Sequence, residues 1–211
     1  MRWPAPVRGR DDAVPLARRV LGIDPGSVIT GWGVVESAGN SLIHLAHGTV
    51  ATAGAQGQAA RLERIYRGLE EAIGSYNPDG VCVERVFFAR NAQSALKLGQ
   101  ARGVAILAAA RNSLTVHEYA AVEIKAAVVG YGHATKQQVQ MMIASLLRLN
   151  GKLPADAADA LAAAICHLHM QTLRAHLVEA LPKNIAPLAR KTPGGPISTR
   201  IKSIWIRRIY K

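Results

Sequence analysis

Four acidic residues stand at positions from which they could share one chemical task. Asp24 ends a short apolar run and precedes a Pro-Gly turn, and Glu84 ends a second apolar run. Asp156 and Asp159 are three residues apart in an alanine-rich segment, where a helix would present both carboxylates on one face. An acid at a strand end needs a cation, a donor or water, because burying an unpaired carboxylate is costly.

Carboxylates brought together in this way would repel one another strongly unless divalent cations lay between them. Oxygen ligands favour a hard ion, and Mg²⁺ or Mn²⁺ fits best. Two such ions about 4 Å apart would activate a water and stabilise the leaving oxygen of a phosphodiester. A zinc site is not indicated, because Cys166, His167 and His169 lie in an apolar helical segment without a second pair of ligands.

Each acid also has a simpler interpretation. Asp-Pro-Gly is a common turn sequence, so Asp24 could be an ordinary turn residue. Asp156 and Asp159 could owe their positions to the helix dipole, which favours acids near a helix N-terminus. The combination favours a shared site, because two apolar strands each end in an acid and one helix offers two more.

The hydrophobic pattern predicts the elements that would position these acids. Strands are expected at 20–24, 30–35, 42–50, 81–84 and 114–117, and helices at 59–76, 92–110, about 120–129, 135–149 and 155–178. Short turns join the first three strands, which predicts an antiparallel meander. The later strands are separated by helices and should pair in parallel. We therefore expect an α/β fold with a mixed five-stranded sheet flanked by helices.

Composition is typical of one globular domain. The chain has 211 residues, of which 49% are hydrophobic, enough to bury one core. Neither a membrane span nor the apolar core of a signal peptide is evident, so we expect a cytoplasmic protein without membrane association. Cys82 and Cys166 are too few for a disulfide framework, and we expect both thiols to be buried and reduced.

The net charge of +12 is concentrated at the two ends of the chain. Residues 1–20 contain five Arg and two Asp, and residues 182–211 contain eight Lys or Arg and no acid. We expect a flexible N-terminal extension over 1–19, one folded domain over 20–178, and a basic, disordered tail over 179–211. Basic ends suggest a polyanionic partner, although such a tail is as often merely solvated.

Four stretches of the sequence together resemble the bacterial RuvC family of Holliday junction resolvases. They are Leu21–Ser27, Glu84–Phe87, Asn91–Gly103 and Ala155–Leu161, in the family's order and spacing, within a match from about residue 20 to 175. The resemblance implies that residues 20–178 form an RNase H-like nuclease domain that acts as a homodimer. It also implies symmetric nicking of four-way DNA junctions, which leaves 5′-phosphate and 3′-hydroxyl ends, together with the RuvA and RuvB branch-migration proteins.

The resemblance implies roles for particular residues as well. The family's four catalytic and metal-binding acids correspond to Asp24, Glu84, Asp156 and Asp159. Two Mg²⁺ ions per active site are implied, and Mn²⁺ should substitute for them. The family's basic cleft residues correspond to Lys125 and Lys136, and its junction-contacting aromatic residue corresponds to Phe87. Without the resemblance, the two lysines would be ordinary helix-surface residues and Phe87 a core residue.

Some positions depart from the family pattern. Arg85 stands where a neutral amide is usual, and His117 stands where an apolar or aromatic residue is common.

Segment 92–110 is a candidate for part of the dimer interface, because Gly99 and Gly103 would allow close approach of a second helix. The alternative is that these glycines pack on the chain's own sheet.

Two rival functions deserve a test. An actin-like or sugar-kinase-type ATPase domain also opens with a strand, an Asp-x-Gly turn and a return strand, but it needs a second half for which this chain is too short. A non-catalytic junction-binding protein would have no reason to keep four acids where DNA phosphates must approach. A cleavage assay on a four-way junction in Mg²⁺ discriminates among the three functions.

Overall fold

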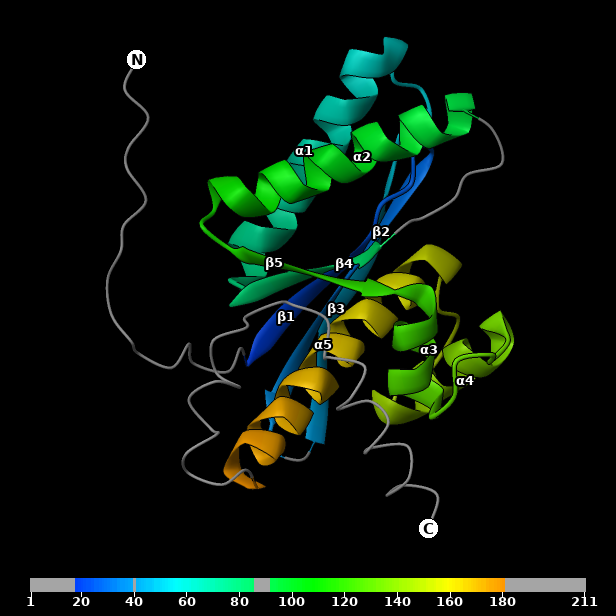
Figure 1. The fold of residues 1–211 in the computed structure, drawn as a ribbon. Helices are drawn as coiled ribbons and strands as arrows, with labels where there is room; N and C mark the ends of the chain where they lie inside the picture. The colour runs from blue at the N-terminus through cyan, green and yellow to red at the C-terminus, as the bar shows by residue number, and fades with distance from the viewer. Residues whose placement is uncertain (1–17, 40, 86–91, 181–211) are drawn as a thin grey trace.

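The computed structural model describes residues 18–39, 41–85 and 92–180. The strands are β1 (Arg19–Asp24), β2 (Ile29–Ala38), β3 (Ser41–Ala51), β4 (Gly80–Arg85) and β5 (Thr115–Ala120). The helices are α1 (Gly57–Tyr76), α2 (Ala92–Arg111), α3 (Ala121–Val129), α4 (Lys136–Leu146) and α5 (Ala155–Ala180). This is the predicted order of elements (Figure 1). The extension predicted over 1–19 and the tail predicted over 179–211 lie almost entirely outside the described residues.

The strands form one sheet in the order β3-β2-β1-β4-β5. β1 pairs antiparallel with β2, and β2 with β3, because short turns connect them. β1 pairs in parallel with β4, and β4 with β5, because the connections pass through α1 and α2. The predicted mixed five-stranded sheet is therefore confirmed.

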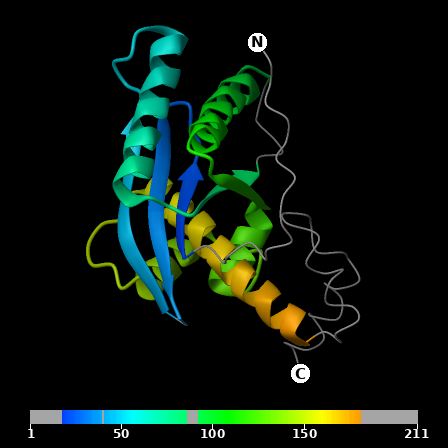
Figure 2. The same ribbon diagram turned by 90° about the vertical axis from the view of Figure 1, so that its left-hand side faces the viewer.

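Helices cover both faces of this sheet (Figures 1 and 2). The alternation of side chains along β1 shows the two cores: Leu21 and Ile23 pack with α1 and α2, whereas Val20 packs with α3, α4 and α5. All three side chains are fully buried. A central strand that is buried on both faces must be apolar at every position, which explains the unbroken apolar run before Asp24.

Helix α5 lies unusually close to the sheet. A Cβ atom added to Gly22 of β1 would stand 1.8 Å from the carbonyl oxygen of Ala160. The helix offers small side chains in return, and Ala157, Ala158 and Ala160 are all fully buried. The alanine-rich composition of this segment therefore reflects close backbone packing.

The core also contains two thiols and a histidine. Cys82 and Cys166 are free and buried, as predicted. The buried ring of His167 stacks on His117 with centroids 4.0 Å apart, and its Nδ1 lies 3.1 Å from the hydroxyl of Tyr119. Burial lowers the pKa of His167 to about 3, so the ring is neutral. None of the helices in the described ranges combines the length and apolar character that crossing a bilayer requires.

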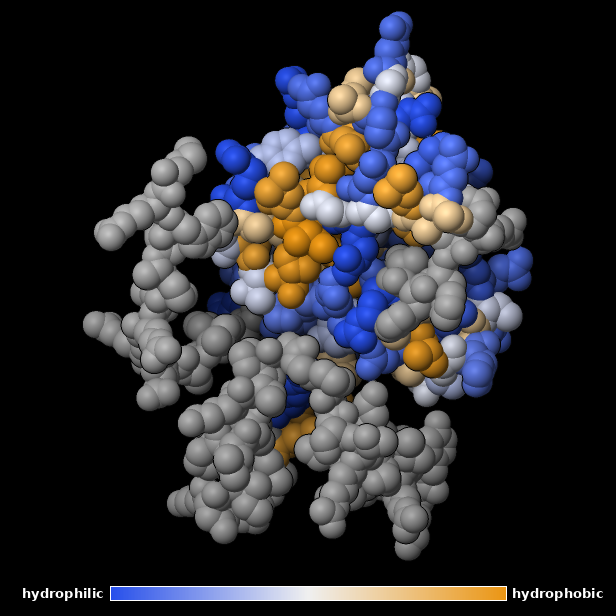
Figure 3. Space-filling model, turned by 45° about the horizontal axis from the view of Figure 1, so that its top comes forward, coloured by the Kyte–Doolittle hydropathy of each residue, from blue (hydrophilic) through white to orange (hydrophobic). Residues whose placement is uncertain are grey.

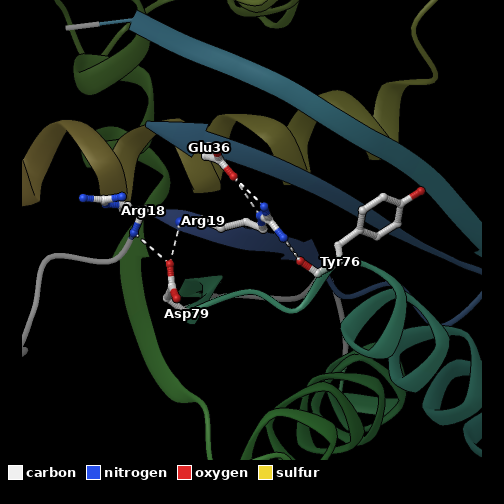
Figure 4. A network of polar contacts seen from close by, with 5 residues as sticks. All are labelled: Arg18, Arg19, Glu36, Tyr76 and Asp79. Carbon is white, nitrogen blue, oxygen red and sulfur yellow. Dashed lines mark hydrogen bonds and ion pairs between the residues drawn. The ribbon is translucent and has the colours of Figure 1, made fainter. Parts of the chain in front are cut away.

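A network centred on Arg19 fastens the start of β1 to its neighbours (Figure 4). Its guanidinium donates to Glu36 Oε2 from Nε at 2.9 Å and from Nη2 at 2.7 Å, and Nη1 donates to the carbonyl of Tyr76 at 2.5 Å. The carboxylate of Asp79 accepts the backbone N–H groups of Arg18 and Arg19, each at 2.8 Å. The network joins β1, β2 and the α1–β4 connection at the end of the sheet opposite Asp24.

Replacing Arg19 with Met should lower the free energy of unfolding by about 1 kcal/mol, because two partly buried acceptors lose a charged donor. Urea denaturation measures this loss. Arg67→Met is the matched control, since its ion pair with Glu63 has side chains 77% and 58% exposed, whereas Arg19 and Glu36 are 34% and 29% exposed. The control should change stability by a few tenths of a kcal/mol at most. Equal losses in the two variants would contradict the prediction.

Candidate active site

Two of the four predicted acids lie at the ends of neighbouring strands, on the same side of the sheet's perimeter. Asp24 is the last residue of β1, and Glu84 is the last but one of β4. These strands are parallel neighbours, and Ile23 pairs with Val83, so the next residue of each strand stands at the same level. Each carboxylate is half-buried. The fold thus brings together two acids that are 60 positions apart in the sequence.

The other two acids come from the start of α5. Asp156 and Asp159 lie in the first turns of this helix, and both are half-buried. The helix begins after Pro154, whose carbonyl accepts the N–H of Ala158 at 2.9 Å. Because α5 crosses β1 and β2 in close contact, its first turns lie over the edge where Asp24 ends its strand.

The charges of three of the acids act on the fourth, Asp24. The pKa of Asp24 is raised from 3.8 to about 7, first by burial and then by the charges of Asp159, Glu84 and Asp156. Lys136 opposes this shift only in part. Asp24 is therefore the carboxylate on which the other three act.

Two lysines border the acids. Burial and the charge of Asp159 raise the pKa of Glu84, whereas Lys125 of α3 and Lys136 of α4 lower it. Lys136 Nζ donates to Asp159 Oδ2 at 2.6 Å. That hydrogen bond is the main reason why the pKa of Lys136 is raised. The structure therefore places both predicted basic residues beside the acids, whereas Phe87 lies outside the described residues.

The donor set fits hard divalent cations. It consists of carboxylate oxygens alone, and their mutual repulsion persists in spite of two nearby lysines. Within 18–39, 41–85 and 92–180, no three His, Cys, Asp or Glu side chains already converge tightly enough to hold an ion. The acids thus form an open cluster, in which Asp159 is engaged by Lys136.

The turn behind Asp24 depends on two buried threonines that the sequence analysis did not single out. Thr30 Oγ1 donates to the carbonyl of Gly26 at 2.9 Å, and Thr52 Oγ1 donates to the carbonyl of Ser27 at 3.0 Å. Both residues are at most 2% exposed. Both hydroxyls therefore hold the turn from its buried side. In the sequence, a threonine within an apolar strand was the signal that could have pointed to such a partner for Thr30.

Replacing Asp24 with Asn should stabilise the metal-free protein, increasingly so as the pH rises. The folded-state pKa of about 7 lies above the ordinary 3.8, so the contribution of Asp24 to stability is full below about pH 4 and is lost as the pH rises through 7. The amide carries no charge and escapes this loss. Urea unfolding in EDTA should show an advantage of Asp24→Asn that grows by about 1–3 kcal/mol between pH 4 and pH 8.

The control for this experiment is Glu71→Gln, which neutralises an exposed acid on α1. Its stability should follow the wild-type pH curve. If stability depended on pH in the same way for wild type and Asp24→Asn, the pKa of Asp24 would not be raised in the folded protein.

Comparison with known proteins identifies the family of this chain. Residues 20–167 match the sequence model of the family described as crossover junction endodeoxyribonuclease RuvC. The protein of that name from Geobacter metallireducens is 58% identical over 149 residues, which cover 71% of this chain and 91% of the relative.

Solved structures agree as well. T. thermophilus RuvC in complex with Holliday junction substrate matches with a TM-score of 0.70 and 34% identity, over 74% of this chain and 96% of that one. The yeast mitochondrial Holliday junction resolvase Ydc2 matches with a TM-score of 0.58 and 17% identity, over 84% and 88% of the two chains, and so shares the fold. With the family model covering most of its length, this chain belongs to the RuvC family of crossover junction endodeoxyribonucleases.

Proposed function

We propose that this chain is a homodimeric endonuclease that resolves four-way DNA junctions by paired symmetric nicks. The observation that carries the proposal is the cluster of four carboxylates around Asp24, whose pKa is raised to about 7. Such a cluster is costly unless it binds cations, and it borders two lysines that suit a phosphate backbone. Membership of a nuclease family favours this function over an ATPase or a non-catalytic junction-binding protein.

In this proposal the divalent cations, Mg²⁺ or Mn²⁺, are held by Asp24, Glu84, Asp156 and Asp159. Two such cations would supply an activated water and compensate the charge on the leaving oxygen of a phosphodiester. We expect the bond between phosphorus and the 3′ oxygen to break, which leaves 5′-phosphate and 3′-hydroxyl ends. The protein's own contribution is to hold four anionic ligands on rigid elements: two strand ends and one helix start.

The lysines have a separate task. Lys136 is exposed and bonded to Asp159, and Lys125 is half-buried near Glu84. We assign both to contacts with the DNA backbone, and Phe87 to stacking on an unpaired base. The Nζ of Lys136 bonds only Oδ2 of Asp159, so the other carboxylate oxygen could hold a cation while the lysine charge stays beside the site. The RuvA and RuvB branch-migration proteins are the partners that we expect for this activity.

A homodimer would supply two active sites related by a two-fold axis, as symmetric nicking requires. Helix α2 is our candidate for the interface. Its buried face consists of alanines such as Ala101 and Ala105, whereas Leu96 and Leu107 on other faces are 64% and 52% exposed. Apolar side chains gather on the face of the molecule that carries α2 (Figure 3). Within the described residues, the added Cβ of Gly99 or Gly103 meets no atom within 4 Å, so neither packs on the sheet of its own chain.

Replacing any one of the four acids with its amide should abolish nicking while junction binding stays intact or improves. Each amide keeps the shape of the side chain but removes an anionic ligand, and it also reduces repulsion of phosphate. Gel shifts and denaturing-gel nick mapping on one four-way junction, in Mg²⁺ and in Ca²⁺, measure the two effects. Ca²⁺, which accepts longer bonds and looser geometry, should support binding but little cleavage.

Asp79→Asn is the matched control for these variants, since Asp79 binds backbone N–H groups at the opposite end of the sheet. It should nick at close to the wild-type rate. An acid whose amide variant keeps wild-type nicking would lose its assignment as a ligand, and retention by all four would refute the metal mechanism.

Leu107→Glu should produce a monomer, because it places a charge in the apolar face of α2. Light scattering measures the mass, and the fraction of junctions nicked in both strands measures coordination, which should fall to the value expected for independent cuts. The control Met141→Glu changes a residue of α4 that is 73% exposed, and it should remain dimeric. A Leu107→Glu protein that is still dimeric would exclude this part of α2 from the interface.

A further inference from the structure

We propose that Gly31 is a positioning residue for the active site, fixing the distance between Asp24 and the first turn of α5. The inference rests on the proposed function, because it assumes that Asp24 and Asp156 bind the same cations. It concerns a residue without a side chain, which contributes no ligand and touches no substrate. Its effect would be exerted entirely through the backbone.

Gly31 contacts both parts of the acid cluster. In the sheet it is the register partner of Asp24, across the antiparallel β1–β2 pair. On the face toward α5 it lies directly under Asp156: an added Cβ would stand 2.0 Å from the carbonyl oxygen and 2.3 Å from the carbonyl carbon of that residue. Gly31 is thus the point at which the strand that pairs with one acid meets the helix backbone that carries another.

The same row of helix carbonyls continues over Gly22. Ala160 is one turn beyond Asp156, and its carbonyl oxygen would lie 1.8 Å from a Cβ on Gly22. Gly22 and Gly31 lie on neighbouring strands, so the helix axis rests on two glycines at two successive turns. Two such supports fix the height and tilt of α5, and Gly31 is the support at the end that carries the acids.

Gly33 provides an internal comparison. It lies on the same strand, two residues further on, and faces the same helix. A Cβ on Gly33 would meet side-chain atoms, Cδ2 and Cγ of Leu161 at 2.6 Å, and would stay 3.4 Å from the backbone nitrogen. Gly31→Ala must therefore move the backbone of Asp156, whereas Gly33→Ala disturbs a buried side chain. Both substitutions cost stability, but only the first changes the spacing of the acids.

The test compares Gly31→Ala, Gly33→Ala and wild type in three measurements. Mn²⁺ binding without DNA is followed by electron paramagnetic resonance, melting temperature is recorded in EDTA, and nicking of a four-way junction is titrated with Mg²⁺. Gly31→Ala should weaken Mn²⁺ binding about ten- to a hundredfold and raise the Mg²⁺ requirement for nicking in the same proportion, which is the usual effect of changing a group that orients a metal ligand. Gly33→Ala should lower the melting temperature but keep wild-type Mn²⁺ affinity.

Wild-type Mn²⁺ affinity in a folded Gly31→Ala protein would overturn the inference, as would an equal loss in Gly33→Ala. If Gly31→Ala does not fold, hydrogen exchange of the wild-type protein in EDTA decides. The amides of Ala160 and Leu161 should exchange as slowly as that of Ile165, since Gly31 holds this turn without metal; fast exchange would overturn the inference. A wild-type protein that neither binds Mn²⁺ nor nicks junctions would instead refute the proposed function.

Discussion

The contact between the backbone of α5 and the two central strands is the constraint on which the rest of the structure depends. Helices normally rest on sheets through their side chains, but here an added Cβ on Gly22 would fall within 1.8 Å of a helix carbonyl. This closeness needs glycine in the strands and alanine in the helix. It brings the first turns of α5 down to the edge where β1 and β4 end, so Asp156 and Asp159 can face Asp24 and Glu84.

The charge that this contact assembles works against folding. Burial and three neighbouring carboxylates raise the pKa of Asp24 to about 7, so near neutral pH the cluster carries unfavourable repulsion. Lys136 offsets part of it through its bond with Asp159. Stability must therefore come from elsewhere, including the two apolar cores and the Arg19 network at the far end of the sheet. A site whose carboxylates repel one another without cations is well suited to bind them, because bound cations relieve the repulsion.

Much of the fold could be predicted because local signals agree with the tertiary structure. The apolar runs at β1 and β4 are buried on both faces, so their composition identifies them as central strands whatever packs on them. The lengths of helices α1 and α5 can be read from the periodic apolar or small residues in their sequences. Short turns after β1 and β2 allow only antiparallel pairing, and helical connections to β4 and β5 lead to parallel pairing.

The sequence by itself determined which acids could form the site: acids at two strand ends and two more on one face of a helix. Lys125 and Lys136 were added by the family resemblance alone. The types and spacing of the acids are local properties, visible without a fold. Only the tertiary structure decided that Lys136 binds Asp159, that Thr30 and Thr52 fix the turn, and that Gly31 lies between two acids. These contacts join residues from different elements. Their distances depend on how closely α5 packs, and that closeness is a property of the assembled backbone.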